Sequence, residues 1–177
     1  MGRDILKYGV IAGLVVAAGM WGAVLAFRGS MTHDMRAMAV TYLVMLVALS
    51  TVFLGIKHHR DVDRGGVIRF WPAFGLGLGI SFVAGVFYML SWETVQATVL
   101  QDFATDYAAS VIAQAKANGA DAATLAKTIA QMESFKVQYA NPLFRLPMTF
   151  VEVFPVGVLV SLVSALVLRN PWVLPAR

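Results

Sequence analysis

The sequence has no cysteine and few charged residues. Without cysteine, this chain of 177 residues can form no disulfide and can perform no thiol chemistry. Charged residues make up 14% of the chain, whereas an average soluble domain has about 25%. Hydrophobic residues make up 59%, and the mean hydropathy is +0.71. These deviations indicate an integral membrane protein.

Motifs for catalysis and for phosphate binding are also missing. The sequence contains no Gly-x-Ser-x-Gly, His-Glu-x-x-His or Gly-Lys-Ser/Thr pattern. The Gly-rich run at 75–79 lies inside an apolar segment with no lysine beside it, so it is no phosphate-binding loop. The sequence therefore favours a non-enzymatic protein, and we expect neither a metal nor a cofactor.

Four long apolar blocks occur, at residues 8–27, 37–56, 70–92 and 146–168. A helix needs about 20 apolar residues to cross about 30 Å of hydrocarbon. Trp71 and Trp92 bracket the third block, as expected of aromatic residues at the two membrane interfaces. The blocks predict an all-α protein with one membrane domain over residues 1–177, a bundle of four transmembrane helices.

The segment between the third and fourth blocks, residues 95–140, predicts a helical hairpin. Apolar residues recur every three or four positions on both sides of Asn118-Gly119, which favours two amphipathic helices joined by a turn. No turn signal separates the third block from Lys116. We therefore expect one continuous helix that stands out as a stalk, in preference to two helices lying flat on the membrane.

The apolar stripes of this hairpin include four aromatic residues, Phe103, Tyr107, Phe135 and Tyr139. Such stripes can be buried only against each other, the membrane or a partner. We interpret these four residues as a partner-facing surface.

Lysine and arginine are concentrated near both termini and in the loop between the second and third blocks. The positive-inside rule then predicts that both termini are cytoplasmic and that the hairpin is extracytoplasmic. Although the net charge is +4, the cations lie at block edges, so we expect contact with lipid and not with nucleic acid. The predicted anionic-lipid contacts are Lys57, Arg60, Arg64 and Arg69.

His58 and His59 lie close to Asp61 and Asp63 in the same loop. Adjacent residues point to different helix faces and no cysteine assists, so we interpret this segment as a solvated loop, not a metal site.

Glu152 lies inside the fourth apolar block. A charged side chain at mid-bilayer costs at least about 2.5–3.5 kcal/mol, so its presence suggests a function. Glu152 either binds a proton or cation inside the bundle, or stays near the outer headgroups with a polar neighbour. Arg145 precedes it by two turns on the same face, and Glu93 ends the third block at the same depth. The three residues form a candidate polar site.

Pro155 removes one backbone hydrogen bond of the fourth helix and, with Gly157, predicts a kink or hinge. Small residues at four-residue spacing predict close helix packing, either within the bundle or in a dimer. They include Gly9, Gly13, Gly75 and Gly79.

Several segments resemble a bacterial membrane-protein family called domain of unknown function 4199. They are residues 7–14, residues 45–61 with their Leu-Gly-Ile-Lys-x-x-Arg-Asp ending, residues 132–136, and residues 141–145 followed by 152–157. The resemblance implies a bacterial inner membrane and four spanning helices, and it brings no known activity.

Two functions of different classes remain. The first is an accessory, assembly or partner-binding subunit that uses the exposed hairpin. The alternative is a small transporter or channel component, acting as a homo-oligomer, that uses Glu152.

Overall fold

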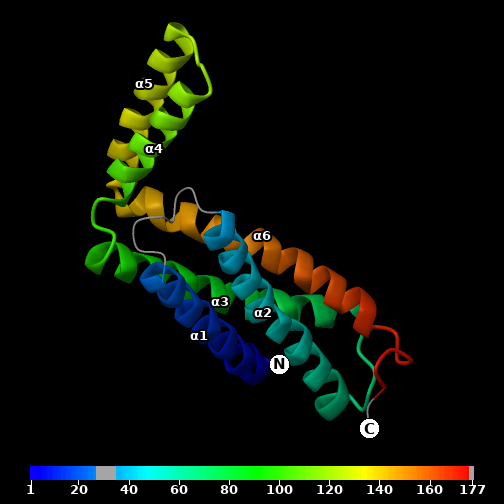
Figure 1. Ribbon diagram of the computed structural model, residues 1–177. Helices are drawn as coiled ribbons and strands as arrows, with labels where there is room; N and C mark the ends of the chain where they lie inside the picture. Colours follow the sequence, from blue (N-terminus) through cyan, green and yellow to red (C-terminus); the bar gives the residue numbers. More distant parts are fainter. Residues whose placement is uncertain (27–34, 176–177) are drawn as a thin grey trace.

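The computed structural model describes residues 1–26 and 35–175, and these residues form helices joined by short connections (Figure 1). Four helices are long and apolar enough to cross a membrane, with the second candidate span covering Tyr42–Asp63. They are α1 (Gly2–Ala26), α2 (Met35–His58) with its π-helical extension η1 (His59–Asp63), α3 (Phe70–Thr98) and α6 (Pro142–Leu168). The predicted all-helical class is confirmed.

The hairpin between α3 and α6 consists of α4 (Phe103–Ala117) and α5 (Ala122–Tyr139). Gly119 has a φ of 73°, the left-handed conformation in which many helices end. Asp121 caps α5, because its side chain accepts a hydrogen bond from the backbone N–H of Thr124.

The bundle is built around α3, which packs against α1, α2 and α6. Apolar side chains of α2, α3 and α6 form its main core: Leu49, Val52, Ile56, Leu76, Ile80, Ala165 and Leu168. Large apolar side chains on the outer faces, such as Leu54 and Leu159, are exposed. This distribution is expected of helices whose outer faces contact lipid.

Glycines allow α1 and α3 to lie very close together. A Cβ added to Gly9 or Gly13 would come within 2.6 Å of an α3 side chain, and one added to Gly79 would lie 2.7 Å from Ile5 of α1. Gly75 is exposed. Three of the four predicted packing glycines therefore serve contacts within this chain.

Small residues also join α3 to α6. The Ser81 hydroxyl donates to the Gly157 carbonyl oxygen over 3.3 Å, and a Cβ on Gly157 would lie 2.7 Å from the Cβ of Ser81. Gly157 is thus needed for close packing, and α6 continues as a helix through Pro155.

The predicted continuous helix from the third span to Lys116 is wrong. α3 ends at Thr98, and α4 begins at Phe103 after a turn. The carbonyl oxygen of Val95 accepts the N–H groups of both Val99 and Leu100, which ends the regular α-helical pattern. Val99 and Leu100 pack onto a core cluster formed by α1 and α3, so tertiary contacts override the helix-compatible local sequence here.

The hairpin turns away from the line of α3 instead of extending it (Figure 1). It lies at one end of the bundle, whereas the start of α1 and the end of α6 lie at the opposite end. The straight stalk expected from an unbroken helix is therefore not formed.

Candidate functional site

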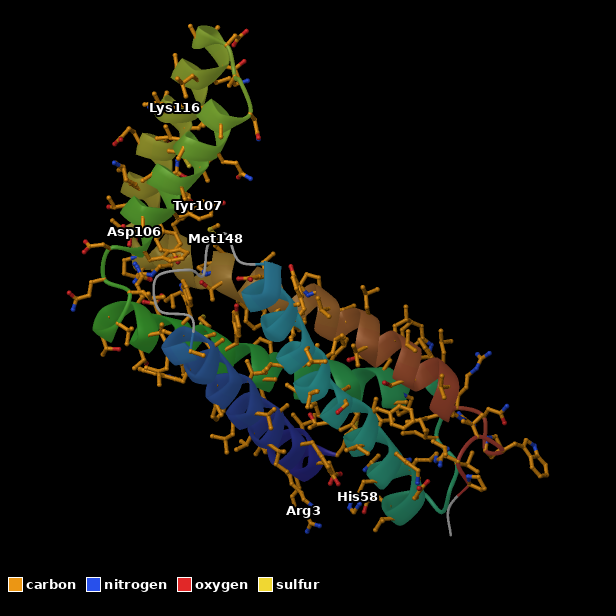
Figure 2. The ribbon with its side chains drawn as sticks, in the orientation of Figure 1. Arg3, His58, Asp106, Tyr107, Lys116 and Met148 are labelled. Atoms are coloured by element: carbon orange, nitrogen blue, oxygen red, sulfur yellow. The ribbon has the colours of Figure 1, made fainter. Side chains whose placement is uncertain are left out.

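A cavity of about 650 Å³ lies where the base of the hairpin meets the bundle. We call it the hairpin-base pocket. Tyr107 of α4 and Met148 of α6, two of its lining residues, are close to this junction in Figure 2, while Arg3 and His58 lie at the far end. Each of the helices α1 to α6 contributes to its wall. The lining residues are Val16, Gly19, Met20, Ala23, Val24, Tyr42, Val44, Met45, Tyr88, Trp92, Phe103, Tyr107, Met132, Phe135, Tyr139, Met148, Thr149 and Glu152.

Glu152 is the only charged residue among the described residues that line this pocket. Its side chain is exposed and lines the cavity. Tyr88 of α3 lines the same cavity, and its hydroxyl is close enough to the Glu152 carboxylate to interact with it. A single carboxylate is thus presented to a largely apolar space.

The other two residues of the predicted polar site pair with each other. Arg145 Nε lies 2.7 Å from Oε1 of Glu93, and an Nη atom lies 2.5 Å from Oε2, so the guanidinium binds the carboxylate through two parallel hydrogen bonds. Its other Nη donates to the Tyr139 carbonyl oxygen over 3.0 Å. Arg145 therefore joins α6 to α3 and to the end of α5, and its partner is Glu93, not Glu152.

The hairpin aromatics point inward. The ring centroid of Phe103 lies 4.9 Å from that of Trp92 and 5.8 Å from that of Tyr139, and the centroids of Tyr107 and Phe135 lie 5.6 Å apart. The Trp92 indole N–H donates to the Tyr139 hydroxyl over 2.7 Å. Burial raises the pKa of Tyr139. These rings, predicted to face a partner, instead hold α4 and α5 together and line the hairpin-base pocket.

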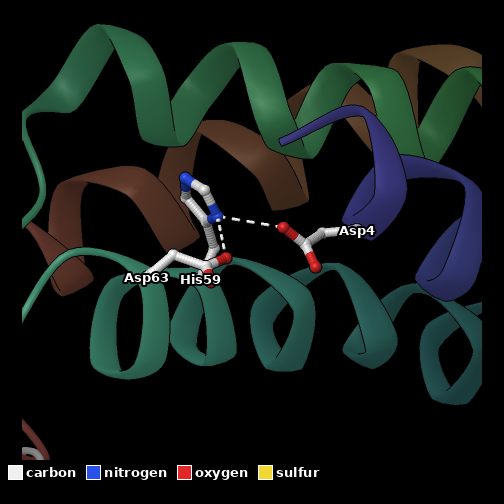
Figure 3. Close-up of side chains that lie close together, drawn as sticks. All are labelled: Asp4, His59 and Asp63. Atoms are coloured by element: carbon white, nitrogen blue, oxygen red, sulfur yellow. Dashed lines mark hydrogen bonds and ion pairs between the residues drawn. The ribbon is translucent and has the colours of Figure 1, made fainter.

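A second polar cluster joins Asp4, at the start of α1, to His59 and Asp63 of η1 (Figure 3). The start of α1 is at the end of the bundle opposite the hairpin (Figure 1). His59 Nδ1 lies 2.7 Å from the Asp63 carboxylate and 3.0 Å from that of Asp4. His59 and Asp4 are buried. The expected solvated loop is therefore wrong at His59, which lies in η1 and connects α2 to α1. Asp4 was missed because nothing in the sequence shows that it meets a residue 55 positions away.

These three residues lie close enough together to hold a metal ion. A metal on Nδ1 would require the proton to be on Nε2, and metal-bound histidines normally donate that N–H to an acceptor. Here Nε2 of His59 is buried and has no hydrogen-bond partner among the described residues. The arrangement fits a helix-to-helix hydrogen bond better than a metal centre.

The four predicted lipid-contact residues have different surroundings. Arg64 and Arg69 are exposed, and Lys57 pairs with Asp61 over 2.5 Å. Arg60 is fully buried. Its guanidinium binds Asp61 and donates to the carbonyl oxygens at positions 173 and 174, so it anchors the C-terminal segment and leaves no surface for a lipid headgroup.

The all-helical fold and its four long apolar helices are those of a membrane protein. The chain belongs to the family described as "Protein of unknown function (DUF4199)", whose family model matches residues 7–170. No curated protein and no solved structure matches the chain.

Proposed function

We propose that this protein binds a small amphipathic molecule in the hairpin-base pocket. The observation that carries the proposal is the cavity itself, because about 650 Å³ lies within the range of about 300–1,000 Å³ typical of small-molecule sites. Such sites combine apolar walls with a few polar groups that orient the ligand. Here the polar groups include Glu152 and the hydroxyls of Tyr88, Tyr42 and Thr149.

The hairpin supplies one wall of this pocket, from α4 and α5, while the bundle supplies the rest. The Arg145–Glu93 pair and the Trp92–Tyr139 hydrogen bond fix the base of the hairpin to α3 and α6. A molecule entering the pocket would thus contact both the candidate spans and the projecting element. A small transporter component would also have to bind its substrate, so ligand binding in this pocket is compatible with a transporter role.

Photoaffinity labelling tests the proposal directly. The full chain in lipid nanodiscs is treated with a long-chain alcohol bearing a diazirine, and the labelled residues are mapped by mass spectrometry. We expect saturable labelling of pocket residues such as Trp92 and Met132, which unlabelled alcohol competes away. Non-saturable labelling spread over the outer faces would contradict the proposal.

A pair of variants on α6 provides the matched control. Met148→Trp places a larger side chain at a half-exposed position in the pocket wall, and should abolish the saturable labelling. Leu159→Trp makes the same kind of change at an exposed position outside the pocket. Its labelling should equal that of the parent chain.

The accessory or assembly role is the second candidate. The projecting hairpin supports it, as do large apolar side chains near the hairpin base, where Val137 is 75% and Leu143 is 82% exposed. Affinity purification in mild detergent should then recover a stoichiometric partner that Val137→Glu releases. A lone homo-oligomer, unchanged by this substitution, would count against the accessory role.

We also propose a bacterial inner-membrane location with both termini cytoplasmic and the hairpin extracytoplasmic. The concentration of cations near the termini supports this orientation. The placement of the α1 start and the hairpin at opposite ends of the bundle is consistent with it.

A further inference from the structure

We infer that the hairpin-base pocket selects organic cations, molecules with an apolar body and one positively charged group. This inference rests on the proposed function and adds the ligand's charge to it. It is carried by the pairing of Glu152 with aromatic walls in a cavity whose described lining contains no cation.

The charge balance around the pocket favours a cation. Arg145 is the nearest arginine along α6, and its guanidinium is already occupied by both carboxylate oxygens of Glu93 and by the Tyr139 carbonyl oxygen. It therefore compensates Glu93 and not Glu152. Among the described residues, no lysine, arginine or histidine forms an ion pair with Glu152. A positively charged ligand would supply a charge opposite to that of Glu152.

The aromatic walls favour the same class of ligand. Rings of Tyr88, Trp92, Phe103, Tyr107 and Phe135 line the cavity. A cation within about 6 Å of a ring centroid is attracted to the ring face, and most strongly to tryptophan. The same surfaces pack against the apolar body of the ligand.

Methionines suggest that the shape of the apolar body can vary. Met20, Met45, Met132 and Met148 line the pocket. Their flexible, polarisable side chains adapt to differently shaped apolar surfaces. An anionic ligand, in contrast, would place a second negative charge beside Glu152 in apolar surroundings, where like charges repel strongly.

Two ions of the same shape and opposite charge test this inference. Binding of tetraphenylphosphonium and of tetraphenylborate is measured on the full chain in nanodiscs, and Met148→Trp nanodiscs are subtracted to remove partition into lipid. We expect saturable binding of the phosphonium alone. Equal saturable binding of the borate would overturn the inference.

Two variants of Glu152 distinguish a loss of binding caused by the lost charge from one caused by misfolding. Glu152→Gln should weaken phosphonium binding by about tenfold or more, whereas Glu152→Asp, which keeps the charge, should retain most of it. Glu133→Gln removes an exposed carboxylate on the hairpin outside the pocket and should have no effect. Unchanged phosphonium binding in Glu152→Gln would overturn the inference.

The outcomes distinguish this inference from the proposed function. If both ions bind saturably and Met148→Trp blocks both, the pocket is a binding site without selectivity for cations. The proposed function is then supported and this inference is wrong. If neither ion binds and the alcohol does not label the pocket, both the proposed function and this inference are wrong.

Nanodisc composition identifies the natural source of the cation. The comparison uses phosphatidylethanolamine and an uncharged glycolipid, because equal net surface charge keeps the phosphonium concentration at the two membranes the same. Weaker saturable phosphonium binding in phosphatidylethanolamine would indicate that a lipid amine headgroup competes for the pocket. Equal binding would indicate no competition from the headgroup and would favour a free organic cation.

Discussion

Breaking the Arg145–Glu93 pair should loosen the hairpin from the bundle. The Arg145 side chain is 13% exposed and that of Glu93 is 25% exposed, so water screens the pair only in part. Hydrogen bonds to charged groups contribute about 1.5–3 kcal/mol each, and partial exposure lowers that contribution. For this bidentate pair we expect a coupling free energy of about 2 kcal/mol.

A double-mutant cycle with Arg145→Met and Glu93→Gln measures this coupling through reversible unfolding in mixed micelles. Each single variant leaves one polar group without its partner, so the double variant should be destabilised by less than the sum of the two. Amide exchange near residues 136–142 should rise in the two variants that carry Arg145→Met, because the Tyr139 carbonyl oxygen at the end of α5 loses its hydrogen bond from Arg145. Effects that add within about 0.5 kcal/mol would refute the pair's structural role.

Three further predictions concern orientation and the two ends of the bundle. A reporter enzyme active only outside the cytoplasm should be active when fused at Asn118 and inactive at either terminus; the reverse pattern would overturn the orientation. Asp4→Asn should lower the free energy of unfolding by about 1–3 kcal/mol, because His59 loses a charged acceptor at a covered site near the end of the bundle. A denaturation midpoint and slope unchanged by Asp4→Asn would show that the Asp4–His59 contact does not stabilise the fold. Hydrogen bonding to Thr124 lowers the pKa of Asp121, so the capping bond is present above the unfolded-state pKa and is lost as the pH falls through the folded-state pKa. The amide chemical shift of Thr124 should therefore change at a pH below the ordinary aspartate value of about 3.9, and a midpoint at or above that value would contradict the cap.

The features that could be predicted from the sequence are those encoded in one continuous segment of the chain. The four apolar blocks indicated the candidate spans, since length and hydropathy alone decide whether a helix can cross a membrane. Asn118-Gly119 correctly marked the hairpin turn, because few residues other than glycine adopt the positive φ found there. Glu152 could also be recognised from the sequence, because it is a lone carboxylate in an apolar block.

Features that depend on pairing between distant residues could not be predicted. The break after Thr98 follows from the packing of Val99 and Leu100 on α1, which local propensity does not encode. Arg60 resembled a surface cation, yet the C-terminal segment folds back and buries it. The pocket itself joins residues of α1 to α6, so no short motif could reveal it.

A crystal structure of the full chain grown with tetraphenylarsonium would test the central claim most directly. Arsenic gives an anomalous signal, so the position of the cation can be located independently of the protein density. We predict an anomalous peak inside the hairpin-base pocket, beside Glu152 and the ring of Trp92. A pocket with no peak, or a peak found only on the outer faces of the bundle, would contradict the account.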